Sequence, residues 1–380
     1  MNKANKIILT GVIIVLVMLV GALYLKNKNS NNTIKIGATI ALTGNYASIG
    51  EQEANGMELA VEEINKAGGV NGKQLSLIVE DNQGDPKSAV AGVTKLLDDD
   101  GVNFIRSAFT GITNAIKSIV AQHNKVMIYT STLSDIAKSN PLFFMDYYKA
   151  DDAGTAIADA VNKSGYRTVK YLTEVSDPCN KYGAAFQAEA DKLGIHIVDK
   201  ETYLTTETDL KTPLLKIKSG AKFDALVLCS WEHEQIIMPE MQQLGMLNIP
   251  TFHLTAPFLS AAQTPEMTQL FSQNKSISTW YGFSDPASAS PKQTEFINDY
   301  YAKFSIKPTP DAAYSYDDIY LLADAAQNCP SLDSNCIASG LAKATYNGAG
   351  GQISFDSDRV AERNTLVIQA VNGSWRTIGQ

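Results

Sequence analysis

The chain has 380 residues, of which 44% are hydrophobic and 19% are charged, and its formal net charge is −8 at pH 7. This composition is ordinary for a soluble globular protein, and the length exceeds that of one compact core, so two domains are expected. The acidic balance argues against a protein that coats nucleic acid, because such a protein needs a basic surface to displace counterions from phosphates.

The first segment predicts a membrane anchor. Residues 7–25 carry no charged side chain, and 19 such residues in a helix nearly match the ~30 Å hydrocarbon core of a bilayer. A cleaved signal peptide has a shorter apolar region and ends at small residues, whereas here Gly21 and Ala22 run directly into Leu23. We expect one uncleaved N-terminal transmembrane helix, with a signal peptide cleaved at an atypical site as the alternative. The polar residues that follow, up to residue 33, predict a short flexible tether.

The next part of the chain alternates strand-like and helix-like segments. Strands are expected at 33–42 and near residues 75, 102 and 126, and helices between them, one of which begins near Ile112. Alternating β and α units predict a parallel, doubly wound sheet. The loop at 42–51 then lies at the carboxyl edge of that sheet, where open α/β folds bind ligands.

The same alternation restarts after Pro141 and predicts a second α/β unit. Its expected strands are at 168–174, 195–203, 225–230 and 251–254. Residues 143–154 show no clear period and are expected to cross between the two units. Helices are then expected at 296–304 and 316–327. The strand-like segment at 365–371 is expected to form a β-ribbon at the end of the chain.

The cysteines predict at least one disulfide. Cys329 and Cys336 flank a short polar stretch, and closing so small a loop is sterically easy, so we expect a surface disulfide, with two free thiols as the alternative. Cys179 and Cys229 each lie where an expected strand gives way to a loop. Because neighbouring strands of a doubly wound sheet end at one edge, a second disulfide between them stays open.

The sequence contains no pattern that is typical of an active site. The histidines His123, His196, His233 and His253 are scattered and lack the short spacing of a metal site. The glycines at 348–351 are not followed by the lysine of a phosphate-binding loop. We therefore expect a protein that is not an enzyme and that uses neither a metal nor a cofactor.

Four segments carry a further signal: LTGNYASIGE from Leu42, VEEINKAGGVNGK from Val61, LIVEDNQGDPKSAV from Leu77 and AAYSYDDIYLLADA from Ala312. Together they resemble the branched-chain amino acid (Leu/Ile/Val) class of type I periplasmic binding proteins. The resemblance runs from about residue 34 to the C-terminus. It implies two α/β lobes joined by three hinge crossings, in an extracytoplasmic receptor that binds a small solute and serves the permease subunits of an ABC importer.

The resemblance also gives expected boundaries for each part of the chain. Residues 1–33 would form the anchor and tether on the extracytoplasmic face of the cell membrane, 34–148 and 283–355 the N-terminal lobe, and 149–282 and 356–380 the C-terminal lobe. The same fold can instead serve as a ligand-sensing ectodomain that signals through a membrane partner, and this is the alternative to transport.

Hydroxyl groups at expected strand ends predict a site for the ligand's carboxylate. Thr110 lies near the start of a helix, where hydroxyl and free N–H groups favour an anion, although a helix N-cap is its alternative role. The resemblance implies that Thr110 binds the carboxylate and that Ser131 and Thr132 add contacts. Tyr46, in the first loop, is expected to cover an apolar part of the ligand, with a simple surface turn as the alternative.

Two aromatic residues are candidates for the opposite wall. Tyr182 matches a tyrosine-glycine pair that lines the pocket in the resembling family, with packing in the core as its alternative role. Trp231 follows the strand at 225–230, where the family commonly has an aromatic residue. It would close over the ligand's side chain or cap the core.

One departure from the family concerns the ligand's ammonium group. Amino-acid binders of this type hold the ammonium with an acid in the loop after the strand at 251–254, because a cation that leaves water needs a charged partner. Thr255 or Ala256 stands at that position here. Glu232, Glu234 or Asp146 could substitute, although an ordinary solvated carboxylate is the favoured interpretation of each. We expect a carboxylate- or amide-containing ligand, and a carboxylate without an amine, an amide or an aromatic acid suits such a pocket better than an amino acid.

Overall fold

The computed structural model describes six stretches of the chain: residues 33–44, 46–231, 233–255, 264–281, 289–363 and 365–378. The expected transmembrane helix at 7–25 lies outside them. Within these stretches, no helix combines the length and the apolar character that crossing a membrane requires.

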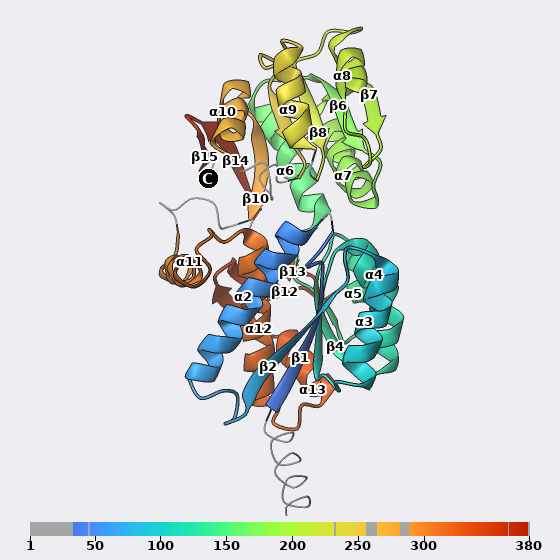
Figure 1. Ribbon diagram of the computed structural model, residues 1–380. Coiled ribbons are helices and arrows are strands. Elements are labelled where there is room, and N and C mark those ends of the chain that lie inside the picture. Colours follow the sequence, from blue (N-terminus) through green and yellow to red (C-terminus); the bar gives the residue numbers. More distant parts are fainter. Residues whose placement is uncertain are drawn as a thin grey trace, which may run out of the picture.

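The described residues form two lobes, each built on its own sheet (Figure 1). The sheet of the N-terminal lobe is parallel throughout, in the order β2-β1-β3-β4-β5, which is an order of doubly wound folds. Its central strands are buried on both faces, as expected of a parallel sheet between helices. The strands are β1 (Thr33–Ile40), β2 (Gln74–Asp81), β3 (Phe104–Ala108), β4 (Val126–Thr130) and β5 (Phe143–Met145).

Helices from distant parts of the sequence cover this sheet. α2 and α12 pack closely, and a Cβ on Gly56 of α2 would lie 2.1 Å from the carbonyl oxygen of Ala312 in α12, so glycine is required there. The helices of this lobe are α2 (Ala47–Lys66), α3 (Pro86–Asp98), α4 (Thr110–Gln122), α5 (Ser134–Ser139), α11 (Pro291–Phe304), α12 (Pro310–Asn328) and α13 (Ser334–Leu341). A small antiparallel sheet joins them, made of β11 (Thr345–Gly348), β12 (Gly351–Phe355) and β13 (Ala361–Glu362).

The sheet of the C-terminal lobe has the order β15-β14-β10-β9-β8-β6-β7. Strands β6 to β10 are parallel to one another. β14 and β15 form the antiparallel ribbon that the end of the sequence predicts. The strands are β6 (Thr168–Glu174), β7 (His196–Tyr203), β8 (Ala225–Cys229), β9 (Thr251–His253), β10 (Ile277–Tyr281), β14 (Thr365–Val371) and β15 (Ser374–Thr377). The helices are α6 (Ala150–Lys163), α7 (Asp177–Leu193), α8 (Lys211–Lys218), α9 (Glu234–Gln243) and α10 (Pro265–Asn274).

The chain passes between the lobes after β5, after β10 and after β13. The first and third passages lie side by side, since the N–H of Met145 donates to the carbonyl of Arg359 over 3.0 Å. The sequence predicted an irregular crossing over residues 143–154, and this was too long. β5 ends at Met145 and α6 begins at Ala150, because three buried apolar residues suffice for an edge strand and the small residues of α6 gave no clear period.

The two cysteine pairs are both disulfides in the structure. Cys329 is bonded to Cys336 between α12 and α13, and Cys179 is bonded to Cys229. The second bond joins the first turn of α7 to the last residue of β8. It therefore connects the start of a helix to the end of a strand at one edge of the C-terminal sheet.

Candidate ligand-binding cleft

A cavity of about 340 Å³ lies between the lobes, at the carboxyl ends of strands from both sheets. Open α/β folds bind ligands at this edge, and a volume of this order suits a small molecule. The N-terminal lobe contributes the first turns of α2, α4 and α12, and the C-terminal lobe contributes the ends of β6 and β8. Of the residues predicted for the site, the cavity is lined by Tyr46, Thr110, Ser131, Thr132 and Trp231.

Three hydroxyl groups meet on the N-terminal wall of this cavity. The Thr110 Oγ1 atom lies 3.3 Å from Ser131 Oγ and 3.2 Å from Thr132 Oγ1. α4 begins at Thr110, with Phe109 as its N-cap residue and no side-chain cap bond, so the Thr110 hydroxyl is not used for capping. The first N–H groups of a helix have no acceptor inside it. Hydroxyls and N–H groups together form a suitable site for an anion.

The residues beside this hydroxyl cluster form an apolar cover. Phe109 has a φ of 64°, which is unusual for a residue other than glycine and places strain at the β3–α4 junction. Its ring lies 4.7 Å from the ring of Tyr46. Tyr46 is 36% exposed and also contacts Gly84, where a Cβ would lie only 2.9 Å from the tyrosine ring. The cover thus depends on one strained residue and one glycine.

An aromatic pair stands on the opposite wall. Trp231 lines the cavity, but Tyr182 does not, because its side chain is fully buried behind the tryptophan, with the two ring centroids 6.3 Å apart. The prediction that Tyr182 lines the pocket therefore differs from the structure by one layer. Tyr182 also contacts Tyr148 in the first crossing, so it supports Trp231 from the core.

Residues 33–374 match the model of a family described as periplasmic binding protein. The chain belongs to this family. Its two α/β lobes are the type I architecture that the sequence predicts, and the resemblance to Leu/Ile/Val-binding proteins is confirmed.

Several individual proteins are similar to this chain. The Leu/Ile/Val-binding protein BraC3 of Rhizobium johnstonii is 29% identical over 192 residues, which are 49% of this chain and 52% of that protein. The leucine-, isoleucine-, valine-, threonine- and alanine-binding protein of Pseudomonas aeruginosa is 29% identical over 204 residues, 50% of this chain and 52% of that protein. The chain thus spans about half the length of the curated relatives it matches. The crystal structure of the branched-chain amino acid transporter substrate-binding protein LivJ from Streptococcus pneumoniae, in complex with isoleucine, is 26% identical and has a TM-score of 0.80, covering 91% of this chain and 99% of that chain.

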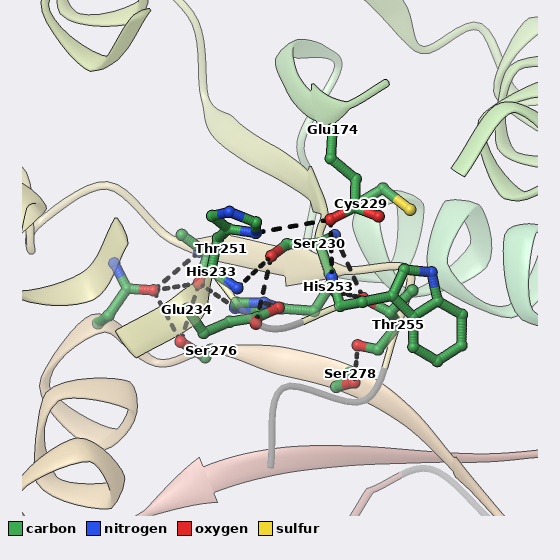
Figure 2. Close-up of polar contacts among 12 residues, drawn as sticks. Glu174, Cys229, Ser230, His233, Glu234, Thr251, His253, Thr255, Ser276 and Ser278 are labelled. Atoms are coloured by element: carbon green, nitrogen blue, oxygen red, sulfur yellow. Dashed lines mark hydrogen bonds and ion pairs between the residues drawn. The ribbon is translucent and has the colours of Figure 1, made fainter. Parts of the chain in front are cut away.

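In this periplasmic binding protein, Thr255 does not line the cavity, because it makes hydrogen bonds between neighbouring strands. The Thr255 hydroxyl donates to the carbonyl oxygen of Ser230, and the Ser278 hydroxyl donates to the carbonyl oxygen of Thr255 over 3.1 Å (Figure 2). These contacts join the ends of β8, β9 and β10. A polar network continues beneath them, and burial there lowers the pKa of His253 to about 3, so this histidine is neutral. The other members of the network are Thr251, Asn274 and Ser276.

Of the acids considered as substitutes for the family's ammonium partner, the two that the structure describes do not line the cavity. Glu232 lies outside the described residues. Glu234 is buried in the network of Figure 2, where it accepts a hydrogen bond from the Ser230 hydroxyl over 3.3 Å. Asp146 pairs with Arg363 in the hinge. Glu234 and Asp146 are therefore neither substitutes for the ammonium partner nor the solvated carboxylates that the sequence favoured, because both are buried and other groups hold their carboxylates.

Other acids, which the sequence analysis did not single out, do line the cavity. Glu53 and Asp311 come from the N-terminal lobe and Glu174 and Asp177 from the C-terminal lobe. Glu174 ends β6, and a search for acids at strand ends would have found it. Glu53 and Asp311 lie within helices, where a single acid usually marks a solvated face.

Buried charges surround the two acids of the N-terminal lobe. Glu53 Oε1 accepts a hydrogen bond from Arg106 Nη1 over 2.7 Å and one from the Thr130 hydroxyl over 3.1 Å. Burial raises the pKa of Asp311 to about 7; the charge on Glu53 adds to this rise, and Arg106 opposes it. Asp311 is therefore poised to change its protonation state near neutral pH.

Proposed function

We propose that this protein is an extracytoplasmic receptor that closes its two lobes around a small solute and delivers it to the permease subunits of an ABC importer. The observation that supports this best is the cavity between the lobes, lined from both sides at the carboxyl ends of the strands. Membership of the periplasmic binding protein family supports the same function. The segment at 7–25 would hold the receptor to the outer face of the cell membrane.

We further propose that the ligand contains a carboxylate held by the Thr110, Ser131 and Thr132 hydroxyls. The relative LivJ was crystallised with isoleucine, and the curated relatives are named for Leu, Ile and Val, so an amino-acid-like ligand is the natural first choice. Trp231, Tyr46 and Phe109 would then pack against its side chain. The part of the cavity lining that the structure describes includes no histidine, cysteine or lysine, which supports binding without chemistry.

Closure is tested by small-angle scattering. If the lobes trap the solute between them, addition of a stabilising ligand should reduce the radius of gyration, because hinge closure expels water from the cleft. The ligand is first found by thermal shift, since a compound that binds only the native state at 100 times its dissociation constant adds about 2.7 kcal/mol of stability. An unchanged scattering profile at saturation would contradict the closure mechanism.

Replacing Thr110 by valine tests the carboxylate site. The variant keeps the shape of the side chain but removes a hydroxyl, so affinity for a carboxylate ligand should fall by roughly 1.5–3 kcal/mol, about ten- to a hundredfold. Thr113→Val is a matched control, because the Thr113 hydroxyl bonds to Ser107 in the buried interior, 2.9 Å away, and does not reach the cavity. Calorimetry on both folded variants should show weaker binding for Thr110→Val alone. Equal affinity of the wild type and Thr110→Val would move the carboxylate elsewhere.

A further inference from the structure

Two buried carboxyl oxygens in the N-terminal wall have no partner among the described residues. They are Glu53 Oε2 and Asp311 Oδ2, and both residues line the cavity. Glu53 is 1% exposed and Asp311 is 7% exposed. Leaving a buried polar atom without a hydrogen bond is costly, and it is more so for a charged group. Two such atoms beside one cavity therefore indicate that something else supplies their hydrogen bonds.

The charge of the lining residues points to the nature of that group. Among the described residues, four carboxyl groups line the cavity, and no lysine, arginine or histidine does. Arg106 lies behind the wall and is occupied by Glu53, Asp318 and Ser315. A ligand whose only charge is negative would lie among negative groups of low solvent exposure, and this repulsion would oppose its binding.

We infer that the solute carries a cationic nitrogen, which Asp311 and Glu53 bind from the N-terminal lobe while Glu174 faces it from the C-terminal lobe. This deepens the proposed function and rests on it. The sequence between β9 and α10 contains no acid, so the partner that the resembling family places there is missing. The structure replaces it with acids from three other elements, and this reverses the expectation of a ligand without an amine.

The position of Glu53 places this cation site beside the anion site. Glu53 accepts a hydrogen bond from Thr130, and the next residue along the chain, Ser131, belongs to the hydroxyl cluster. The two sites are thus neighbours at one strand end, as are the ammonium and carboxylate of an α-amino acid. An ammonium group has three donors, so it can reach both free carboxyl oxygens and retain one donor for a third acceptor.

The third acceptor is available across the cleft. Glu174 is 3% exposed, and its Oε2 atom accepts the backbone N–H of Trp231 over 3.2 Å and lies 3.7 Å from Nδ1 of His233. Because Glu174 ends β6, it approaches the N-terminal wall when the lobes close. A cation between Asp311 and Glu174 would therefore join the lobes.

Protonation of Asp311 adds a pH signature. The groups that face it are Glu53, Arg106, Tyr147 and Tyr314, and the buried carboxyl is partly protonated at neutral pH. An ammonium ligand favours the ionised carboxylate, so its affinity should rise between about pH 6 and pH 8.

The folding stability of the free protein should depend on pH in the opposite direction. A carboxyl whose pKa is raised on folding contributes stability at low pH that is lost as pH approaches 7, so Asp311→Asn should raise the melting temperature at pH 8.

The first experiment compares three sets of compounds that share side chains, by thermal shift at pH 8. The amino acids are L-isoleucine, L-valine, L-phenylalanine and L-glutamine; the deamino acids are 3-methylpentanoate, 3-methylbutanoate, 3-phenylpropanoate and 4-carbamoylbutanoate; the amines are 2-methylbutylamine, isobutylamine, phenethylamine and 4-aminobutanamide. At least one amine-bearing compound should stabilise the protein more than its deamino counterpart. A deamino acid that stabilises as well as its amino acid would overturn the inference while the receptor function stands. A panel without any stabilising compound would overturn both.

The second experiment measures the best amine-bearing compound by calorimetry on two variants. Asp311→Asn should weaken its binding about ten- to a hundredfold and remove the rise of affinity between pH 6 and pH 8, while the deamino acid binds no worse. Asp324→Asn is the matched control, because it removes the same charge from an exposed position on the same helix, outside the lining of the cavity, and it should change affinity less than about threefold. Equal effects of the two variants would show that only the net charge matters and would overturn the assignment to Asp311.

Discussion

Replacing Arg106 by methionine should destabilise the fold by about 3–5 kcal/mol at pH 7. The Arg106 guanidinium is fully buried, where it donates to Glu53, to Asp318 over 3.2 Å and to the Ser315 hydroxyl over 2.9 Å. Methionine fills a similar volume but leaves two carboxyl groups in the core without their cation. Urea unfolding followed by circular dichroism measures the loss.

The pH dependence separates lost charge pairing from lost packing. The substitution removes an arginine that opposes the rise that burial causes in the pKa of Asp318, and the folded state should then bind more protons than the unfolded state. The difference in free energy of unfolding between the wild type and Arg106→Met should therefore shrink as pH falls from 7 to 5. Adding Glu53→Gln and Asp318→Asn to Arg106→Met should recover part of the stability at pH 7, because no unpaired charge then remains. If Arg106→Met loses the same stability at pH 7 and at pH 5, the loss comes from packing and not from charge pairing.

The alternation of strands and helices could be predicted from the sequence because it follows from local patterns. β4 is a buried, largely apolar run between polar turns, and α3 has apolar residues at helical spacing, with Asp85 capping its start through the N–H of Ser88. α6 was missed because its buried face consists mainly of alanines and Gly154, which give little hydrophobic signal. The same small residues let α6 approach α7, since a Cβ on Gly154 would lie 2.5 Å from that of Ala185.

The candidate site was predictable where it follows strand ends and not where it depends on packing. Thr110, Ser131 and Trp231 follow three strands, and parallel strands bring such residues to one edge, where the structure places them. Glu53 and Asp311 come from helices that are distant in sequence, and only the packing of α2 against α12 brings them together. No local pattern distinguishes a helical acid that faces a cavity from one that faces water.

A buried ion pair between the first and third crossings is the second contact with a large expected effect. Arg363 Nε and Nη2 donate to the two carboxylate oxygens of Asp146, each over 2.7 Å, and Nη1 donates to the carbonyl of Gly350 over 3.0 Å. The guanidinium also lies 4.2 Å from the centre of the Tyr314 ring. Both charged side chains are almost fully buried. The pair therefore joins two of the three segments that connect the lobes.

Arg363→Met should lower the free energy of unfolding by about 3–5 kcal/mol, because it leaves the Asp146 carboxylate buried without a cation. Arg363→Lys should recover only part of this loss, since lysine keeps the charge but cannot donate two parallel hydrogen bonds. Lys149→Met is the matched control: Lys149 lies 2.9 Å from Asp356 and connects the same two stretches of chain, but this pair is partly exposed, so its loss should cost under about 1 kcal/mol. Urea titrations of the three variants measure these differences.

Scattering from the free proteins should show a broader range of lobe separations for Arg363→Met than for Lys149→Met, because only the first removes a buried ion pair between the crossings. Equal stabilities and equal scattering for these two variants would assign the Asp146–Arg363 pair no special part in holding the crossings together.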